Sequence, residues 1–466
     1  MLVNNTIGVY GLGAMGRNIA LNMTNQGLSV SVYNRDAEGE NDALRDFFSQ
    51  KAPAKLYRFD TIEDFVLSLE RPRKVLVMVT AGSAVDEVIE QIMPYMDAND
   101  IVIDGGNSSY LDTQARVKKY SVRYLGCGVS GGWYGALHGP SLMFGGSHSA
   151  WLESKAIFQA IAAKRNNQSA CCHWFGEDGA GHFVKMVHNG IEYAMMQSIA
   201  ESYDVLRKIE GLSNDDIASI FGEWNGQELN SYLMRISSEV LSLKGDKGCL
   251  VDNVVDRSSQ KGTGIDFSIC SLKYGVPTPT IIAATAARFL SFSQHRKHIS
   301  SDQAELNIDK QTPSQATLQD VFDSIYCAYV VAFFQGMDLI REVSNKQGWN
   351  IDLKEVASVW EAGCVIQANI FKQLSKELTM ELSSQMVLCE LAEGRVHSLT
   401  KVVSMSASHG IPAPVFSSVL DYYYGIFSNR LPASLIQLQR EYFGSHGFEK
   451  FDDPGVVYHF STGQGA

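Results

Sequence analysis

A glycine-rich turn near the N-terminus constrains the fold of this chain more than any other sequence feature. The residues Gly11-Leu12-Gly13-Ala14-Met15-Gly16 follow a strand-like apolar run, 6–10, and precede a helical pattern over 17–26. In that context Gly11 permits a tight turn, Gly13 lets the backbone approach a pyrophosphate, and Gly16 allows close packing of the helix on the strand. The free N–H groups at the start of the helix then face the phosphates. The pattern predicts a dinucleotide-binding turn formed by residues 11–16.

The spacing of apolar residues changes near residue 180. Before it, strand-like runs (6–10, 29–33, 74–79, 101–104 and 123–129) alternate with helical patterns such as 17–26 and 84–93. This alternation indicates βαβ units and a mostly parallel sheet. From about 180 to 430 helical periodicity dominates. We therefore expect an α/β Rossmann-like N-terminal domain (1–178), a large all-α domain (179–435) and an extended C-terminal tail (436–466).

The helical region contains a weak internal repeat. Ile191-x-x-Ala194 and Asp204-x-x-Arg207 are echoed by Ile325-x-x-Ala328 and Asp338-x-x-Arg341, with the same offset from Ile to Asp. A third segment, 218–221, recurs at 357–360. The pattern favours an internal helical duplication within the all-α domain. Chance similarity between amphipathic helices is the alternative.

Composition limits the partners of the chain. Its 466 residues contain 39 Lys and Arg against 51 Asp and Glu, a formal net charge of −12. Binding to a nucleic-acid backbone requires excess positive charge, so we expect no nucleic-acid partner. The N-terminus lacks a basic segment followed by an apolar stretch, and the longest apolar run, 325–334, falls short of the roughly 20 residues of a membrane span. These features predict a soluble, cytoplasmic protein without a membrane partner.

The eight cysteines show neither a CxxC pair nor a paired zinc spacing. Cys171 and Cys172 are neighbours followed by His173, but no second half-site accompanies them. Free cysteines usually behave as small buried apolar residues. We therefore predict core thiols, a reducing compartment and no metal site.

The end of the second predicted strand bears on the choice of cofactor. NAD-binding proteins usually carry Asp or Glu there for the ribose 2′-hydroxyl, whereas a nearby Arg accommodates a 2′-phosphate. The sequence here is Tyr33-Asn34-Arg35-Asp36. Asn34 lacks the carboxylate and Arg35 supplies a cation, which favours NADP. Two points stay open. The negative charge of Asp36 would repel a 2′-phosphate if its side chain faces the cofactor. Arg35 could instead be a solvated loop residue without a ligand.

A second group of polar side chains follows the change of periodicity. Lys185, His188, Asn189, Glu192 and Tyr193 are spaced at i, i+3, i+4, i+7 and i+8, which places them on one face of a helix. A solvated face, the alternative interpretation, usually repeats Glu and Lys, whereas these five residue types occur once each. A lysine and a glutamate near one substrate form a base and an acid, provided that burial or a neighbouring cation lowers the lysine pKa. The pattern predicts a catalytic helix.

Three glycine-containing segments complete the candidate site. Asn107 follows Asp104-Gly-Gly at the end of a predicted strand, where nucleotide-binding folds bind their ligands. Ser130-Gly-Gly ends the next strand and offers backbone N–H groups to an anion. Lys261-Gly-Thr263-Gly combines a cation and a hydroxyl with two glycines, as a phosphate site would. Each segment alone is also compatible with a turn.

Together these motifs resemble the 6-phosphogluconate dehydrogenase family over nearly the whole chain. The segments IDGGNS, VSGG, GPSLM, GAGHFVKMVHNGIEY, QKGTG and QREYFGSH occur in the family's order and spacing. The resemblance implies a Rossmann-like domain, a duplicated helical domain and a C-terminal tail that reaches the partner subunit of a homodimer. It also implies the NADP-dependent, metal-free conversion of 6-phospho-D-gluconate to D-ribulose 5-phosphate and CO2, in the pentose phosphate pathway and gluconate utilization.

The resemblance also assigns roles to single residues. Lys185 matches the base that takes the proton of the C3 hydroxyl as hydride leaves C3, and Glu192 matches the acid that protonates C1 of the enediol. The expected substrate contacts are Asn107, Ser130, Gly131, Gly132, His188, Asn189, Tyr193, Lys261, Thr263 and Arg288, with Arg440 and His446 supplied by the tail. The expected cofactor contacts are Gly11, Leu12, Gly13, Ala14, Met15, Gly16, Asn34, Arg35, Asp36, Val79, Thr80 and Asn107.

The sequence departs from the family pattern at several positions. Trp133 and Tyr134 stand where two glutamates are usual, Phe144 where proline is usual, and Ile265-Asp266 where Lys-Trp is usual. These positions bear on the cofactor preference and on the carbon skeleton of the substrate. Two other functions stay open: a paralogous β-hydroxyacid dehydrogenase that acts on a related phosphorylated sugar acid, and a non-catalytic nucleotide-binding protein.

Overall fold

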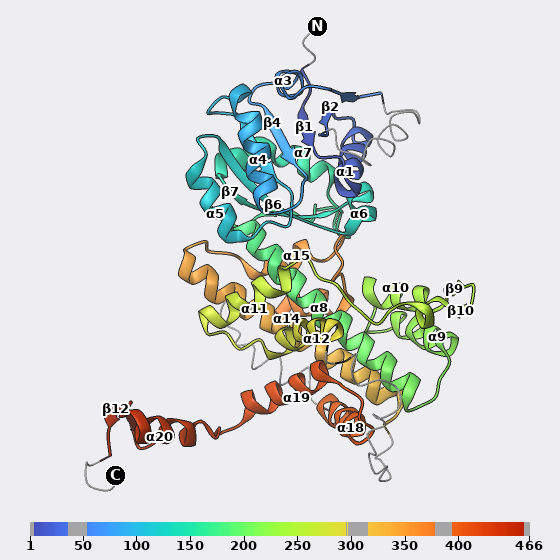
Figure 1. Cartoon of the computed structure of the whole chain (residues 1–466), viewed down its shortest axis with the longest axis vertical. Helices are drawn as coiled ribbons and strands as arrows, with labels where there is room; N and C mark the ends of the chain where they lie inside the picture. The colour runs from blue at the N-terminus through green and yellow to red at the C-terminus, as the bar shows by residue number, and fades with distance from the viewer. Residues whose placement is uncertain (1–3, 36–53, 295, 297–315, 378–393, 461–466) are drawn as a thin grey trace. The chain divides into compact units, whose positions relative to one another are not determined.

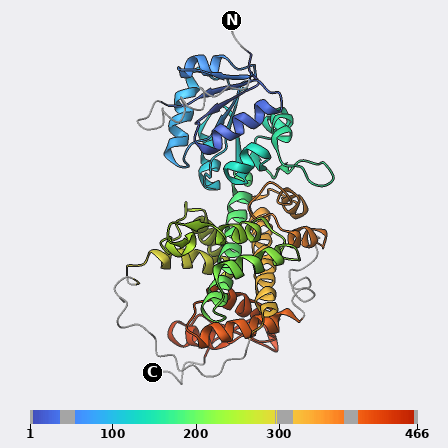
Figure 2. The ribbon, with the colours of Figure 1, turned by 90° about the vertical axis from the view of Figure 1, so that its right-hand side faces the viewer.

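The computed structural model describes residues 4–35, 54–294, 296, 316–377 and 394–460. Asp36, one of the predicted cofactor contacts, lies outside these residues. The chain separates into two compact units, 1–419 and 420–466. The first contains a sheet with helices on both faces, followed by a set of long helices (Figures 1 and 2). No helix in the described part of the chain is long and apolar enough to cross a membrane.

One sheet forms the centre of the N-terminal part. Among the described residues it has eight strands in the order β3-β2-β1-β4-β5-β6-β7-β8. The strands β1 to β6 are parallel, β7 runs antiparallel to β6, and β8 is parallel to β7. The bounds are β1 Ile7–Tyr10, β2 Val30–Tyr33, β3 Leu56–Arg58, β4 Lys74–Val77, β5 Ile101–Asp104, β6 Arg123–Ser130, β7 Ser141–Gly146 and β8 Cys172–Trp174. The five predicted strands are confirmed, whereas β3, β7 and β8 were not predicted.

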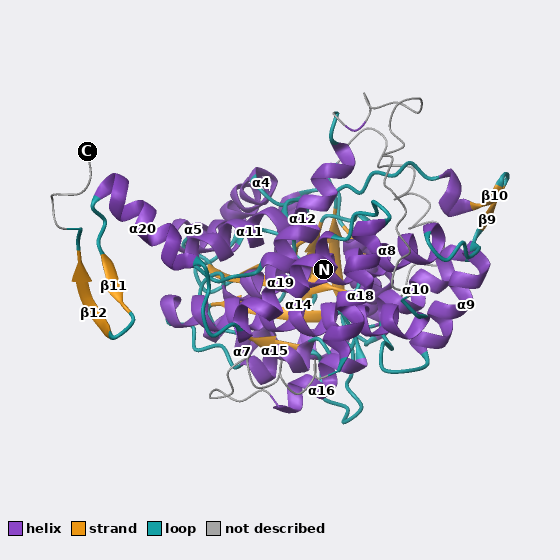
Figure 3. Ribbon diagram, turned by 90° about the horizontal axis from the view of Figure 1, so that it is seen from below, coloured by secondary structure: helices purple, strands orange, loops and turns teal. Residues whose placement is uncertain are grey.

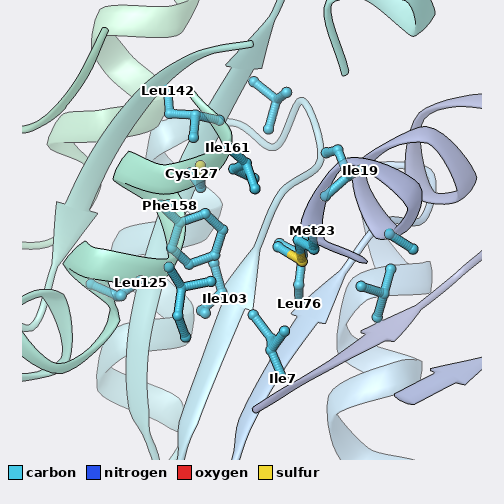
Figure 4. Packing of buried hydrophobic residues seen from close by; sticks show 14 of the residues in the cluster. Ile7, Ile19, Met23, Leu76, Ile103, Leu125, Cys127, Leu142, Phe158 and Ile161 are labelled. Atoms are coloured by element: carbon cyan, nitrogen blue, oxygen red, sulfur yellow. The ribbon is translucent and has the colours of Figure 1, made fainter. Parts of the chain in front are cut away.

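Helices cover both faces of the sheet. On one face a buried cluster joins the central strands to α1 (Ala14–Asn25) and α7 (His148–Ile161), as Figure 4 shows for Met23, Leu76 and Phe158. α6 (Gly132–His138) contributes Ala136 to the same cluster. The other face is covered by α3 (Ile62–Leu67), α4 (Ser83–Ile92), the 3-10 helix Met93–Tyr95 and α5 (Tyr110–Lys119). Coverage on both sides explains why the strands are almost wholly apolar, and the predicted α/β Rossmann-like architecture is confirmed.

Long helices dominate the chain after residue 179. α8 (Ala180–Lys208) begins against β6 and β7 and continues among the helices, where it packs along α14 (Leu318–Gln347) (Figure 1). The other helices of this part are α9 Asn214–Asn225, α10 Tyr232–Leu241, α11 Thr263–Tyr274, α12 Pro279–Phe292, α15 Leu353–Val359, α16 Asn369–Glu377 and α18 Arg395–Ser408. A two-stranded sheet, β9 (Lys244–Gly245) with β10 (Gly248–Cys249), and the 3-10 helix Leu250–Asn253 follow α10. The predicted helical domain is therefore confirmed.

The repeat seen in the sequence falls on equivalent elements. Its first two segments lie on α8 and on α14, which are 29 and 30 residues long and pack side by side. The third segment lies on α9 in the first copy and at the end of α15 in the second. Each copy thus consists of a long helix followed by a shorter one, as a duplicated helical unit would.

The second unit contains a helix and a hairpin. After α19 (Pro414–Phe427), which crosses the division between the units, come α20 (Ala433–Gly444), β11 (Phe448–Lys450) and β12 (Asp453–Tyr458), the two strands being antiparallel (Figure 3). The buried Glu441 carboxylate accepts the N–H of Gly447 at 2.6 Å and of Phe460 at 2.9 Å, and so ties the hairpin to the helix. The prediction that the chain is extended from 436 is wrong for 436–444, because the run 433–441 is composed mainly of good helix formers. The proposed domain boundaries stay predictions.

Candidate active site

The glycine-rich turn has the shape that a bound pyrophosphate requires. Gly11 has a φ of +97°, and a Cβ atom there would lie 2.6 Å from the carbonyl oxygen of Met78. A Cβ atom on Gly16 would lie 2.0 Å from the carbonyl oxygen of Gly11, so the helix start packs tightly on the turn. Around Gly13, by contrast, a Cβ atom would meet nothing within 4 Å. The backbone at the N-terminus of α1 is therefore open to a ligand, and the residues fit the phosphates of a dinucleotide.

The loops beside this turn hold the remaining predicted cofactor contacts. The Asn34 side chain accepts the N–H of Leu12 at 2.8 Å, so it braces the glycine turn. Arg35 is exposed just beyond β2, where it is accessible to a ligand. Val79 and Thr80 follow β4, and Val79 lies between the glycine turn and the loop after β5, because Cβ atoms on Gly11 and Gly106 would both contact it, at 3.0 and 3.2 Å. The structure thus brings the three loops together at the carboxyl ends of β1, β4 and β5.

The predicted catalytic helix is α8, and its first half is buried against the sheet. Lys185 is 6% exposed and His188 is fully buried. The Lys185 Nζ atom donates a hydrogen bond to Asn189 Oδ1 at 2.8 Å and lies 3.4 Å from His188 Nδ1. On the other side of the ring, His188 Nε2 lies 3.0 Å from the hydroxyl oxygen of Ser130, at the end of β6. The interpretation of this stripe as a solvated face is therefore wrong, since only Glu192 of the five is appreciably exposed.

Burial favours the neutral forms of the predicted base and acid. Removal from water lowers the pKa of Lys185, although the nearby Glu192 acts in the opposite direction. Burial likewise raises the pKa of Glu192, opposed by Lys185 and Arg288. The pKa of His188 falls well below its ordinary value, first through burial and then through the charge of Lys185. A neutral amine and a protonated carboxyl on one helix are the states that a base and an acid need before a reaction starts.

Ser130-Gly131-Gly132 forms the turn between β6 and α6. Gly131 has a φ of +110° and Gly132 a φ of +62°. A Cβ atom on Gly131 would also lie 2.5 Å from the carbonyl oxygen of Gly363. Asn107, in the loop after β5, is exposed. Both segments lie at the carboxyl edge of the sheet, the edge at which ligands bind in such folds.

Three helices bring together the predicted phosphate contacts of the first unit. The guanidinium carbon of Arg288, on α12, lies 3.6 Å from the centre of the Tyr193 ring on α8. Thr263 begins α11, and a Cβ atom on the next residue, Gly264, would lie 2.6 Å from the same ring. Lys261 is exposed two residues before α11. A guanidinium on an aromatic ring, with the start of a helix packed against the same ring, suits a phosphate group.

Comparisons with known proteins identify the family of this chain. The family model described as the C-terminal domain of 6-phosphogluconate dehydrogenase matches residues 181–462, and the NAD binding domain of 6-phosphogluconate dehydrogenase matches residues 6–176. The chain belongs to the 6-phosphogluconate dehydrogenase family. This outcome confirms the resemblance inferred from the motifs.

Relatives in the 6-phosphogluconate dehydrogenase family match over their full length. The chain is 39% identical to "6-phosphogluconate dehydrogenase, decarboxylating" of Aggregatibacter actinomycetemcomitans, covering 100% of this chain and 98% of the relative. The protein with the same description from Drosophila melanogaster is 40% identical, with 98% and 97% covered. A solved structure of Plasmodium falciparum 6-phosphogluconate dehydrogenase, described with NADP+ and with its substrate 6-phosphogluconate, is 35% identical with a TM-score of 0.90, and 97% and 99% are covered.

Some of the positions at which this chain departs from the 6-phosphogluconate dehydrogenase pattern lie beside predicted site residues. Trp133 and Tyr134 follow the Gly131–Gly132 turn directly, and their side chains are 63% and 55% exposed. The Trp133 carbonyl oxygen accepts a hydrogen bond at 2.9 Å from Asn18 of α1, the helix that the glycine turn precedes. Phe144 instead lies in the core, against Trp151 and Phe158. Ile265 and Asp266 follow Thr263 in the first turn of α11, so this departure also lies beside a predicted substrate contact.

Two predicted residues belong to the second unit. Arg440 lies on α20, where it donates to Gln437 Oε1 at 3.2 Å, and His446 follows the helix with its ring 6.1 Å from that of Phe443. Both are exposed. Their role in the site of a partner subunit stays a prediction.

Two residues that contact His188 and Lys185 were not predicted from the sequence. The indole ring of Trp360 packs edge to face on His188, with the ring centres 5.8 Å apart. Gly128, on β6, leaves room for the side chain of Lys185.

Among the described residues no three His, Cys, Asp or Glu side chains are grouped to hold a metal ion. The neighbours Cys171 and Cys172 are buried in the core.

Proposed function

We propose that this chain catalyses the oxidative decarboxylation of 6-phospho-D-gluconate to D-ribulose 5-phosphate and CO2, with reduction of NADP. The observation that carries the proposal is the buried amine of Lys185, held at hydrogen-bond distance from Asn189 and next to His188, with Glu192 two helical turns along. Among the described residues Lys185 forms no ion pair, and burying a charge without such a partner is costly, so a buried amine at this place is not what a non-catalytic scaffold requires.

In the first step Lys185 acts as the base. The neutral amine takes the proton of the C3 hydroxyl while the C3 hydride leaves, which forms the C3 carbonyl. Bound NADP supplies the acceptor for that hydride. Asn189 and His188 orient the Lys185 amine, and His188 is itself held by Ser130. We assign the binding of the sugar acid to Asn107, Ser130, Gly131, Gly132, His188 and Asn189.

In the second step the C1–C2 bond breaks and CO2 leaves. The electron pair of that bond moves toward the C3 oxygen, which the protonated Lys185 stabilises by returning its proton. Glu192 then gives a proton to the carbon that lost CO2, while the Lys185 amine takes back the proton from the former C3 oxygen, which leaves the ketone of ribulose 5-phosphate. The raised pKa of Glu192 supports this role, because partial burial disfavours the charged carboxylate and so favours the form that can give a proton.

The choice of NADP rests on the loop after β2. Arg35 is the exposed cation at that position, and Asn34 carries no charge that would repel a 2′-phosphate. The Asn34 amide accepts the N–H of Leu12 and donates to the carbonyl oxygen of Arg35, so it joins the glycine turn to the loop after β2. The phosphate of the substrate is assigned to Tyr193, Lys261, Thr263 and Arg288.

We further propose a cytoplasmic homodimer that acts in the pentose phosphate pathway and in gluconate utilization. The second unit supports an association between copies, because Tyr442, Phe443 and Phe451 are 73%, 73% and 89% exposed. In the proposal, Arg440 and His446 complete the phosphate site of the partner copy. Light scattering of the full chain and of a chain that ends at residue 430 tests the dimer, and the KM for 6-phosphogluconate of the truncated chain tests the shared site.

The deciding experiment measures the purified enzyme with 6-phosphogluconate, gluconate and other phosphorylated sugar acids. Reduction of NADP and of NAD is followed together with CO2 release. We expect NADP reduction and CO2 in equal amounts from 6-phosphogluconate, and little activity with gluconate. Faster turnover of a different phosphorylated sugar acid would instead favour the paralogous dehydrogenase, for which the exposed Trp133 and Tyr134 are the structural indication.

A further inference from the structure

The buried arginine Arg116, on α5, makes an unusually complete set of hydrogen bonds. It is 3% exposed. Its Nε and Nη2 atoms donate to Asp86 Oδ2 at 3.2 and 2.8 Å, and Nη2 also donates to the carbonyl oxygen of Gly82 at 2.8 Å. Its Nη1 atom donates to Ser108 Oγ at 3.1 Å and to Asp104 Oδ2 at 3.4 Å. All three guanidinium nitrogens are thus in use.

These partners belong to two different loops of the site. Gly82 and Asp86 lie at the start of α4, directly after the Val79–Thr80 loop assigned to the cofactor. Asp104 ends β5, and Ser108 directly follows Asn107, which is assigned to both substrate and cofactor. Arg116 therefore connects, through its side chain, the loop after β4 with the loop after β5.

The carboxylate of Asp104 fixes the loop that carries Asn107. It accepts the N–H of Gly106 at 3.0 Å and the hydroxyl of Ser108 at 2.6 Å. It also accepts the hydroxyl of Tyr124 at 3.0 Å, from the neighbouring strand β6. Asp104 is fully buried, so its charge needs a cation close by, and Arg116 is the guanidinium that approaches it.

The same helix also contacts the catalytic helix. One turn before Arg116, the hydroxyl of Thr113 lies 2.7 Å from Nδ1 of His182, which is buried at the start of α8. His182 precedes Lys185 by one turn. One face of α5 thus contacts the cofactor loop, the Asn107 loop and the start of the lysine helix.

We infer that Arg116 is a positioning residue for hydride transfer, because it fixes the position of the Asn107 loop relative to the cofactor loop. The inference rests on the proposed function, because it assumes that the two loops hold the substrate and the cofactor. Arg116 acts through these loops and is not itself a catalytic residue. A lysine cannot replace it, because an ammonium group on a flexible stem does not reproduce the planar fork that reaches both carboxylates.

The test compares Arg116→Lys with a matched control, Arg73→Lys. Arg73 is 5% exposed and also bonds two carboxylates, those of Asp97 and Asp100, at 3.1 and 3.0 Å. It precedes β4, at the amino end of the strands, so it lies away from the loops of the site. A milder variant, Ser108→Ala, removes one bond to Arg116 and one to Asp104 and keeps both charges. Each protein is assayed with 6-phosphogluconate and with the same substrate deuterated at C3, and its NADP dissociation constant is measured by protein fluorescence.

For Arg116→Lys we expect kcat per folded enzyme to fall about 10- to 100-fold, because a small misplacement of reacting groups has effects of that size. The KM for 6-phosphogluconate should change much less. The deuterium isotope effect on kcat should rise, since hydride transfer becomes slower than product release, and NADP should bind more weakly. Ser108→Ala should show the same changes to a smaller extent, and Arg73→Lys should show none of them.

Two results would overturn the inference. One is that Arg116→Lys and Arg73→Lys both lower the folded fraction while kcat per folded enzyme and the isotope effect stay those of the wild type. The other is an unchanged isotope effect in a well-folded Arg116→Lys enzyme. If the wild type binds NADP but oxidises no 6-phosphogluconate, the proposed function fails instead. The role of Arg116 is then decided by NADP affinity alone, which must fall for Arg116→Lys and not for Arg73→Lys.

Discussion

Lys185, on α8, passes so close to Gly128 that no larger residue fits at this position of strand β6. A Cβ atom on Gly128 would lie 2.3 Å from the Cβ atom of Lys185 and 2.8 Å from its Cγ atom. One turn earlier, α8 lies equally close to β7, because a Cβ atom on Gly181 would lie 2.5 Å from the backbone nitrogen of Gly145. The depth of the lysine in the protein, and hence its lowered pKa, depends on these glycines.

Gly128→Ala adds only one methyl group, but it should impair catalysis strongly. We expect a loss of about 1–3 kcal/mol in the free energy of unfolding from overpacking, and a fall in kcat of about 100-fold from displacement of the amine. Gly425→Ala is the control, since a Cβ atom there would meet nothing within 4 Å. Urea unfolding and steady-state kinetics measure the two effects. Normal turnover of Gly128→Ala would show that the lysine tolerates a shift.

Lys185→Met should abolish turnover while NADP binding stays close to that of the wild type. The substitution keeps an unbranched side chain up to the ε position and removes the proton acceptor, whose loss costs on the order of 10²–10⁴ in rate. Lys208→Met, on the same helix but 58% exposed and paired with Asp204 at 2.7 Å, is the control. Near-normal turnover of Lys185→Met would contradict the assignment of the base.

Glu192→Gln should affect the late step more than the first. We expect reduction of NADP in the first turnover to persist better than steady release of CO2, because the proposed proton transfer from Glu192 follows decarboxylation. Rapid-quench measurement of both products separates the steps. An equal loss of NADP reduction, measured with the substrate, and of CO2 release, measured with the 3-keto intermediate, would count against the role of Glu192.

Much of this arrangement could be predicted from the sequence, and the reasons for the misses are physical. The helix face of Lys185 and the glycine turn are local patterns, so spacing alone places their side chains. Strand β7 was missed because its sequence is rich in glycine and its pairing partner, β6, is set by tertiary contacts. The role of Gly128 was missed for a related reason: its neighbour Lys185 is 57 positions away, and only the fold brings them together.

Arg35→Ala should lower kcat/KM for NADP far more than for NAD, by about 1.5–3 kcal/mol, as expected for a hydrogen bond to a charged group. Arg58→Ala is the control, because Arg58 lies on the neighbouring strand β3 and pairs with Asp60 at 3.3 Å. Asp36→Thr should raise the efficiency with NADP only modestly. An equal effect of Arg35→Ala on both cofactors, or a wild type that prefers NAD, would refute the interpretation of this loop and leave that of the lysine helix intact.

Glu201 links α8 to the start of α19 and predicts a dependence of stability on pH. Its carboxylate is 2% exposed and accepts the N–H groups of Val415 and Phe416 at 2.9 and 3.0 Å. Burial raises the pKa of Glu201 to about 7, and the hydrogen bonds from Phe416, Val415 and Gln197 only partly oppose this. The folded protein therefore binds a proton more tightly than the unfolded chain does, between the ordinary pKa of 4.5 and about 7.

In that window the contribution of Glu201 to stability is lost as the pH rises, since the buried carboxyl is increasingly charged. Glu201→Gln cannot ionise and keeps one acceptor for the helix start. We expect the free energy of unfolding of Glu201→Gln minus that of the wild type to increase by about 3 kcal/mol from pH 4.5 to pH 7 and to be level above it. Urea unfolding over this range measures the difference, and Glu223→Gln, an exposed position on α9, is the control. A difference that is independent of pH would mean that Glu201 stays ionised throughout, its charge stabilised by the N-terminus of α19.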